Sequence, residues 1–214
     1  MSTLILNGSP KGNSKNCNSR IFSEEFTRNM KNPCEIRCIA KADAKELAQY
    51  AQSFDTLIMI MPLYIHAMPG IVMRFIEAME PAASQGKSIG FIIQAGFIET
   101  AQERFVEAYF AELAKQLNYS YLGTVSKGEA AGVYMYPKMF KKLFRLLNDL
   151  GEAFEETNAF DQDIVKKLGK PYELSKSTLR ILHMVHLVGL DKLGWHRELK
   201  KNHALDKRLD RPFL

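Results

Sequence analysis

The sequence predicts an α/β fold in which helices cover both faces of a parallel sheet, and three observations support this. Short aliphatic runs alternate with longer segments of helical period through residue 125. Two of the runs, 56–61 and 88–93, are apolar nearly throughout, as expected of central strands buried on both faces. Turn-forming residues such as Gly8 and Pro62 stand where runs end. With 214 residues and 46% hydrophobic content, the chain can bury one large core.

Five strands are expected from the aliphatic runs, at residues 4–6, 34–39, 56–61, 88–93 and 119–125. The run 34–39 alternates apolar and polar side chains, so we expect it to be an outer strand. Between the first two strands, Ile21, Phe22 and Phe26 form the apolar face of a helix that ends near Asn32.

Two later helices also have apolar faces. In the segment 102–117 apolar positions recur every four residues, and we expect this face to pack on the sheet: Phe105, Tyr109, Leu113 and Leu117. A glycine-containing stretch, 128–136, follows the last strand. The helix after it presents a second apolar face: Phe140, Leu143, Phe144, Leu147, Leu150 and Phe154.

The sharpest candidate boundary is Lys170-Pro171, where a proline follows the basic end of a helix. We therefore divide the chain into a domain, 1–170, and a basic helical C-terminal extension, 171–214. The extension carries an apolar stripe: Leu179, Leu182, Val185, Leu187, Val188 and Leu190. Such a stripe is too apolar for a free surface helix, so we expect it to pack on the domain or on the partner in a homodimer.

Charge and cysteine content argue against several classes of protein. Of the net charge of +5, all arises beyond residue 137, where 16 Lys and Arg are interleaved with 11 Asp and Glu, as on a solvated helical surface. The three cysteines match no zinc pattern, and no ligand partner stands at metal spacing from His183 and His186. The apolar run 179–190 is interrupted by Arg180 and these histidines. We expect a cytoplasmic protein with no metal, no membrane span and no nucleic-acid partner.

Parallel strands create binding sites at their carboxyl ends, and three loops leave such ends, at 8–19, 62–69 and 94–99. The first loop is rich in glycine, serine and asparagine, contains Lys11, and directly precedes a helix. The N-terminus of a helix has unpaired N–H groups and a partial positive charge, which can hold a phosphate against the backbone. The first loop is therefore a predicted phosphate site.

Other phosphate-binding loops fit this segment less well. The spacing of a nucleoside-triphosphatase loop is missing, and a dinucleotide fingerprint would need a third glycine beside Gly8 and Gly12. A phosphatase would use Cys17 as its nucleophile, but Arg20 follows too soon to encircle a phosphate. Cys17 is then either a small side chain that fills the loop or a reactive thiol.

The three loops together resemble those of the flavodoxin-like NAD(P)H-dependent FMN reductases and quinone reductases. The matching stretches are Gly8-Ser9-Pro10-Lys11 with Cys17-Asn18-Ser19, Pro62-Leu63-Tyr64 with Pro69-Gly70, and Gln94-Ala95-Gly96-Phe97. They span about the first 100 residues. The resemblance implies a five-stranded parallel sheet of order 2-1-3-4-5, bound FMN, and NAD(P)H as co-substrate.

In that family the loops hold successive parts of FMN. The first would hold the phosphate through Ser9, Lys11, Cys17, Asn18 and Ser19. The second would follow the isoalloxazine ring through Pro62, Leu63, Tyr64 and Ile65, with Tyr64 against the ring and the N–H groups of 63–66 near N5. The backbone of Gln94, Ala95 and Gly96 would reach the pyrimidine end. Two positions depart from the family: Lys11 replaces a commoner arginine, and Cys17 replaces a hydroxyl.

The resemblance implies an FMN-dependent oxidoreductase that passes hydride from NAD(P)H through the flavin to a small acceptor: a quinone, nitroaromatic, azo compound or flavin. Tyr64 and His66 are the candidate catalytic residues, although each could be an ordinary loop side chain. Two alternatives stay open. One is a flavodoxin-like electron carrier, against which the basic composition argues, and the other is a flavin-free binding module on the same fold.

Overall fold

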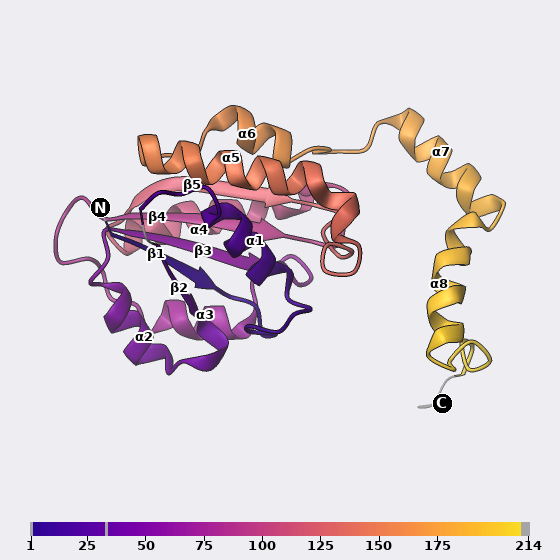
Figure 1. Ribbon diagram of the computed structural model, residues 1–214, viewed down its shortest axis with the longest axis horizontal. Coiled ribbons are helices and arrows are strands. Elements are labelled where there is room, and N and C mark those ends of the chain that lie inside the picture. Colours follow the sequence, from indigo (N-terminus) through magenta and orange to yellow (C-terminus); the bar gives the residue numbers. More distant parts are fainter. Residues whose placement is uncertain (1, 33, 211–214) are drawn as a thin grey trace. The chain divides into compact units, whose positions relative to one another are not determined.

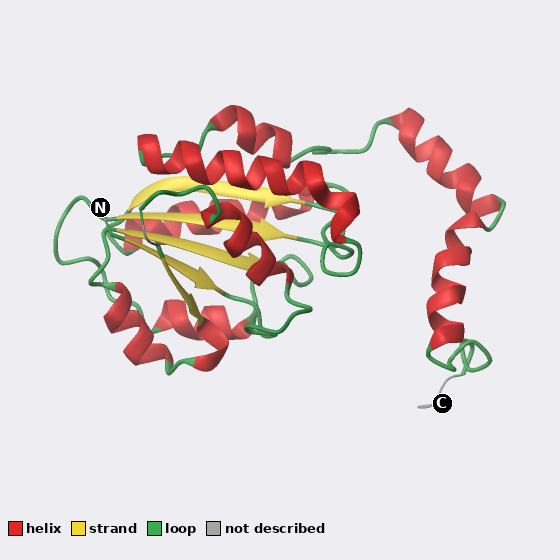
Figure 2. Cartoon of the chain, in the orientation of Figure 1, coloured by secondary structure: helices red, strands yellow, loops and turns green. Residues whose placement is uncertain are grey.

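A computed structural model describes residues 2–32 and 34–210 of the chain. The chain divides into two compact units, Met1–Glu173 and Leu174–Leu214. The first unit contains a single sheet, drawn as arrows in Figures 1 and 2, and the candidate site. The second unit contains two helices.

The sheet has five parallel strands in the order β2-β1-β3-β4-β5. They are β1 (Thr3–Asn7), β2 (Glu35–Cys38), β3 (Thr56–Pro62), β4 (Ser88–Gln94) and β5 (Ser120–Lys127). The predicted order 2-1-3-4-5 is therefore confirmed. The outer strand β2 is shorter than expected, because the chain turns into a short 3₁₀ helix at Ile39. All five carboxyl ends lie at one edge of the sheet, toward which the arrowheads in Figure 2 point.

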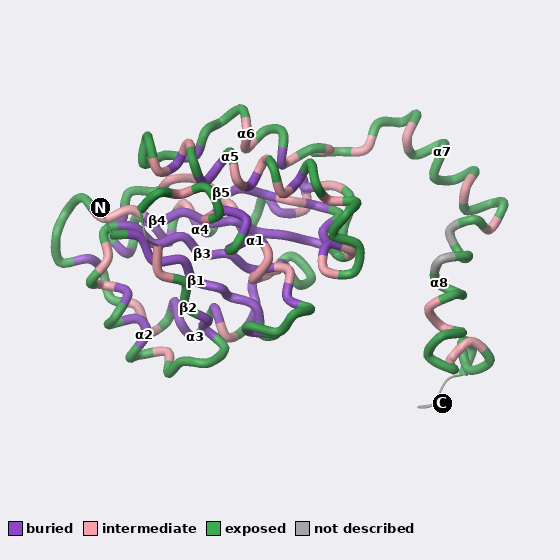
Figure 3. The backbone as a smooth tube through the Cα atoms, viewed as in Figure 1, coloured by how far each residue is buried: buried purple, intermediate pink, exposed green. Residues whose placement is uncertain are grey.

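Helices of the first unit cover both faces of the sheet (Figure 1). They are α1 (Asn18–Thr27), α2 (Ala44–Ala51), α3 (Gly70–Glu77), α4 (Arg104–Gln116), α5 (Lys141–Thr157) and α6 (Gln162–Leu168). Alternate residues of β3 enter two different clusters: Leu57 and Met59 pack with α2, α3 and α4, while Ile58 and Ile60 pack with α1, α5 and α6. This alternation explains why the strand is apolar throughout. Figure 3 shows the resulting buried layer along the strands.

The face of α4 differs from the predicted one. Leu113 and Leu117 are buried as expected, but Phe105 and Tyr109 are exposed, and Val106 and Phe110 pack on the sheet instead. A strict spacing of four residues drifts around a helix of 3.6 residues per turn, so the buried face follows a mixed spacing of four and three. Phe110 stacks in parallel on Phe91 of β4, with ring centroids 3.9 Å apart.

The second unit contains α7 (Lys176–Leu187) and α8 (Leu190–Lys201). Ser175 caps α7 by accepting a hydrogen bond from the Thr178 N–H at 3.1 Å. No residue of α7 is buried, and the apolar stripe that begins at Leu179 is largely exposed. Its packing on the domain or on a homodimer partner stays a prediction, and residues 211–214 of the expected extension lie outside the described residues. No helix in the described part of the chain has the length and apolar character to cross a membrane.

Candidate functional site

A cavity of about 400 Å³ lies at the carboxyl edge of the sheet, where the three predicted loops meet. Its lining is Ser9, Lys11, Asn16, Asn18, Pro62, Leu63, Tyr64, Gln94, Ala95, Gly96, Ala130, Ala131, Tyr134 and Met135. We call it the loop cavity. Of the residues proposed from sequence, Cys17, Ser19, Ile65 and His66 do not line it, and the others do. Sequence reasoning missed Asn16 and the contribution of the segment 128–136.

The first loop takes its shape from Asn7, which is buried at the end of β1. The side-chain Oδ1 of Asn7 accepts from the Ser9 N–H at 3.0 Å, and its side-chain Nδ2 donates to the Gly12 carbonyl at 3.0 Å. Gly12 has φ +57°, a left-handed conformation that favours glycine, and its N–H donates to the Ser9 carbonyl at 2.9 Å. The Ser9 hydroxyl accepts from the Lys11 N–H at 3.3 Å, which leaves the hydroxyl proton available to a ligand.

Helix α1 begins at the loop cavity with unpaired backbone donors. Cys17 is the N-cap residue, and its sulfur accepts from the Arg20 N–H at 3.4 Å. The N–H groups of Asn18 and Ser19 have no acceptor within the described ranges. Lys11 adds a positive charge here: its ammonium group donates to the Asn16 carbonyl at 3.4 Å and lies 5.1 Å from the Tyr134 ring centroid. This end of the cavity therefore attracts anions.

The side chains of Cys17, Asn18 and Ser19 form hydrogen bonds within the protein around the cavity. Asn18 donates to the Ala130 carbonyl at 2.7 Å and accepts from the Tyr134 N–H at 3.1 Å. Ser19 is fully buried and accepts from the Gln94 amide at 2.9 Å. Cys17 is fully buried as well. These side chains therefore support the loops from behind, and a ligand would meet the backbone N–H group of Asn18, which lines the cavity.

The second loop makes a tight two-residue turn. Tyr64 and Ala67 exchange backbone hydrogen bonds of 2.8 and 3.0 Å, and the two residues between them are left-handed, with φ +47° at Ile65 and φ +65° at His66. This is the backbone of a type I′ turn, which usually contains glycine or asparagine. A β-branched residue in this conformation is strained, and such strain is common in functional loops.

In this turn, Tyr64 lines the cavity, whereas Ile65 and His66 do not. Tyr64 lines the cavity and is 48% exposed, whereas Ile65 is 86% exposed. His66 stacks parallel to Phe97 at 6.1 Å, with its Nδ1 3.4 Å from the Gln102 carbonyl. The N–H groups of Leu63 and Tyr64 already donate to the carbonyls of Gln94 and Ala67. Of the four N–H groups expected near the flavin N5, those of Ile65 and His66 have no acceptor in the part of the chain that the structure describes.

The third loop connects the cavity to the fifth strand. The Ala95 N–H donates to the Lys127 carbonyl, and the Ala95 carbonyl accepts from the Ala130 N–H, both at 2.9 Å. The Gly96 N–H has no acceptor among the residues described, and Gly96 lines the cavity. It is therefore a donor that a ligand could use.

A fourth segment, 128–136, completes the wall, and we call it the β5 segment. Ala130, Ala131, Tyr134 and Met135 line the cavity. The segment follows the carboxyl end of β5, so the rule that singled out the other loops could have found it. It packs against the third loop so closely that a Cβ on Gly128 would lie 2.5 Å from the Ile98 carbonyl oxygen.

A group of titratable side chains lies behind this wall. Glu103 is fully buried, and neither carboxyl oxygen has a hydrogen-bond partner among the described residues; the nearby Ser126 hydroxyl donates to Glu107 at 2.5 Å. Burial, with a smaller contribution from the nearby Glu107 charge, raises the pKa of Glu103 to about 7. Burial also lowers the pKa of Lys127, although the carboxylates of Glu129 and Glu103 oppose this.

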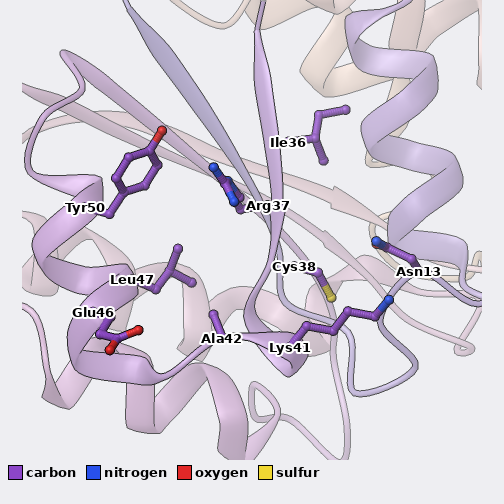
Figure 4. A pocket seen from close by; sticks show the side chains of 9 residues that line it. All are labelled: Asn13, Ile36, Arg37, Cys38, Lys41, Ala42, Glu46, Leu47 and Tyr50. Atoms are coloured by element: carbon purple, nitrogen blue, oxygen red, sulfur yellow. The ribbon is translucent and has the colours of Figure 1, made fainter.

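A further cavity, of about 430 Å³, lies beside the outer strand β2 and contains none of the predicted site residues. Figure 4 shows Lys41 extending toward Cys38 and Asn13. Arg37 is engaged there: it forms an ion pair with Glu35 and lies 5.1 Å from the ring centroid of Tyr50. Because its cations already have partners or open solvent around them, we assign no ligand to this cavity.

Strand order and loop positions together define the flavodoxin-like class of α/β folds. Solved structures with this architecture include an NADPH-quinone reductase from P. pentosaceus, with TM-score 0.54, 17% identity, and coverage of 70% of this chain and 96% of that chain. An FMN-dependent NADH-azoreductase from Bacillus anthracis, solved in complex with FMN, has TM-score 0.54, 15% identity, and coverage of 72% and 100%. An NADH:FMN oxidoreductase has TM-score 0.56, 14% identity, and coverage of 79% and 96%.

These structural neighbours are flavodoxin-like NAD(P)H-dependent reductases, and at these identities the likeness establishes the fold. No protein-family model and no curated protein matches the sequence.

Proposed function

We propose that this chain is an FMN-dependent oxidoreductase that transfers hydride from NAD(P)H to a small acceptor. The observation that carries the proposal is the loop cavity itself: it combines an electropositive helix N-terminus, an exposed aromatic side chain and backbone donors that lack protein acceptors. Its volume of about 400 Å³ falls in the range of cofactor sites. The reductase neighbours on the same fold support the same class of reaction.

The α1 end of the loop cavity suits the FMN phosphate. The N–H group of Asn18, the Ser9 hydroxyl and the Lys11 ammonium group, all from residues that line the cavity, would hold it. A phosphate at this position is stabilised by the partial positive charge of the helix as well as by direct donors. The loss of a hydroxyl at Cys17 matters little here, because that side chain is buried and caps the helix.

The remaining lining suits the flavin ring. Tyr64 would lie against one face of the ring, and Pro62 and Leu63 would pack at its edge. The Gly96 N–H would donate to the polar pyrimidine end. A fixed backbone donor orients the ring without losing side-chain entropy, which is what a cofactor site requires.

When bound, FMN supplies the hydride chemistry, and the protein supplies binding and orientation. In the strained turn that follows Tyr64, the N–H groups of Ile65 and His66 have no acceptor in the described part of the chain, and they would be donors to a bound ring that extends past Tyr64, beyond the cavity lining. His66 does not line the loop cavity, and its stacking on Phe97 fixes the turn. We therefore assign His66 a positioning role, with the protons of the reaction taken from solvent.

The proposal is tested by an anaerobic titration of the purified protein, loaded with FMN, with NADPH and with NADH. We expect a yellow protein whose flavin absorbance is bleached by at least one nicotinamide. Tyr64→Ala should weaken FMN binding about tenfold, since stacking on an aromatic side chain contributes roughly 1–3 kcal/mol.

Tyr136→Ala is the matched control, because Tyr136 is comparably exposed and does not line the loop cavity. FMN affinity should be unchanged in that variant. A protein that binds no FMN in calorimetry removes the proposal. A yellow protein that neither nicotinamide bleaches is an electron carrier instead.

A further inference from the structure

A third cavity, of about 480 Å³, is lined by lysines from four places in the chain. Lys127 ends β5, Lys142 lies in the first turn of α5, Lys167 lies in the last turn of α6, and Lys170 follows that helix. Among the residues that line it, Glu129 is the one carboxylate. We call this the lysine cavity. Four positive charges thus face one negative charge around a single concave surface.

None of these four ammonium groups forms an ion pair or hydrogen bond with any residue that the structure describes. The neighbouring Lys166 differs, because its ammonium group lies 3.9 Å from the Asp163 carboxylate and it does not line the cavity. Burial disfavours the charged form of the Lys127 ammonium group, and three further lysines bring positive charge to the same lining. An anion that enters the cavity removes this cost, so the cavity selects for negative charge.

The same cavity also has an apolar part. Met139, Phe140, Leu143 and Leu146 line it beside the lysines. Met139 is exposed, and Phe140 is only half-buried. An inorganic anion would leave this surface unused, whereas a ligand with a flat aromatic ring and attached phosphates would cover it and meet the lysines.

One continuous stretch of chain contributes lining residues to both the lysine cavity and the loop cavity. Ala130, Ala131, Tyr134 and Met135 line the loop cavity, while Glu129 and Met139, on either side of them in sequence, line the lysine cavity. A ligand that occupies both must therefore be long, with a reactive group at one end and a phosphorylated aromatic group at the other.

We propose that the lysine cavity binds the 2′-phosphoadenosine end of NADPH, so that the protein prefers NADPH to NADH. This inference rests on the proposed function for its reactive end. The adenine ring matches the apolar part of the cavity, and the phosphates match the lysines. NADH carries the same adenine but lacks the 2′-phosphate, so it forgoes the charge-assisted contacts.

Calorimetric titration of the FMN-loaded protein with 2′,5′-ADP and with 5′-AMP tests the cavity without any turnover. We expect 2′,5′-ADP to bind about tenfold or more tightly than 5′-AMP. The double variant K142Q/K167Q should lose about tenfold in affinity for 2′,5′-ADP and little for 5′-AMP. The ratio of kcat/KM for NADPH over NADH should fall by a similar factor.

The double variant K141Q/K166Q is the matched control, because it removes the same charge from adjacent positions on the same two helices that do not line the cavity. It should behave like the unmodified protein. Equal affinity for the two nucleotides, or equal losses in the two double variants, would overturn the inference. Turnover without a preference for NADPH would overturn it and leave the oxidoreductase assignment standing. Absence of FMN binding would refute the proposed function, while the nucleotide titration would still decide the assignment of the lysine cavity.

Discussion

The loop cavity and the lysine cavity both take residues from one stretch of chain, yet different chemical groups line them. The first offers backbone N–H groups, a buried asparagine framework and one lysine. The second offers four lysine side chains beside apolar side chains. Both favour anions, but backbone donors are oriented by the fold, whereas lysine ammonium groups are mobile and well hydrated.

This difference suits the two cavities to two kinds of ligand. A site of fixed backbone donors suits a cofactor that stays bound, because the donors lose no rotamer freedom when it binds. A site of lysines suits a co-substrate that must arrive and leave, since charge speeds encounter and holds the ligand less rigidly. The β5 segment connects the two sites, and disturbing it tests whether they share a wall.

The largest expected effect comes from Gly128→Ala. The added Cβ would lie 2.5 Å from the Ile98 carbonyl oxygen and 2.7 Å from that of Phe97, and neither backbone atom can yield easily. The β5 segment must then move, and the 2.5 Å hydrogen bond from the Glu129 N–H to the Phe97 carbonyl must break. We expect the free energy of unfolding to fall by about 3 kcal/mol, measured by urea denaturation, with both FMN and 2′,5′-ADP binding weakened.

Gly132→Ala in the same segment is the control. A Cβ there would meet Phe140 at 3.6 Å, an ordinary van der Waals contact, so stability and binding should change little. If Gly128→Ala weakened the binding of one ligand and spared the other, the two cavities would not depend on a common wall.

Much of the architecture could be predicted because strong local patterns determine it. The strands β3 and β4 are apolar on both faces, and each ends in a recognisable turn, so their place in the centre of the sheet follows. The loops after β1 and β4 contain small residues where strand ends create sites, and the loop after β3 is bounded by prolines. Sequence patterning was less informative for α4, where two side chains of the predicted face are exposed.

Other features could not be predicted, because they depend on distant contacts. Nothing in the sequence marks Ile65 and His66 as left-handed, since neither is glycine or asparagine. The inward direction of Ser19 follows from its bond to Gln94, 75 residues away. The lysine cavity has no periodic pattern at all: its residues come together only when β5, α5 and α6 pack.

The next expected effect concerns Glu103, the buried carboxyl group whose charge interacts with Lys127. The pKa of Glu103 is about 7 in the folded protein and near the ordinary 4.5 when the chain is unfolded. Between these values the folded state binds more protons, so the free energy of unfolding falls as the pH rises from 4.5 to 7 and stays lowered above that. The contribution is at most about 3 kcal/mol.

Glu103→Gln should remove this slope, because glutamine stays neutral at every pH. Urea denaturation at several pH values across the window measures it. Glu112→Gln, on exposed surface of the adjoining helix, is the control and should keep the slope of the unmodified protein. A slope that persists in Glu103→Gln would mean that another group titrates. Ionised Glu103 also offsets the positive charge of Lys127, so 2′,5′-ADP binding should weaken modestly above pH 7 in the unmodified protein and in Glu112→Gln, but not in Glu103→Gln.

The smallest expected effect is the difference in how salt changes the ligand affinities of the two cavities. Between about 0.1 M and 1 M salt, the distance over which exposed charges interact falls from about 10 Å to about 3 Å. Salt should strongly screen the charges of lysines that line an open cavity, so the affinity for 2′,5′-ADP should fall about tenfold. The affinity for FMN should fall about threefold or less, because short backbone hydrogen bonds and ring contacts are screened little.

Riboflavin, which lacks the phosphate, provides the reference for the loop cavity and should bind with no salt dependence. The difference between FMN and riboflavin then isolates the phosphate contribution. If FMN proved as salt-dependent as 2′,5′-ADP, the charge of Lys11 would outweigh the Asn18 N–H group in holding the phosphate. Lys11→Gln decides between these cases, because it removes the charge and leaves the N-terminus of α1 intact. A variant that still binds FMN well would assign the phosphate to the backbone donors.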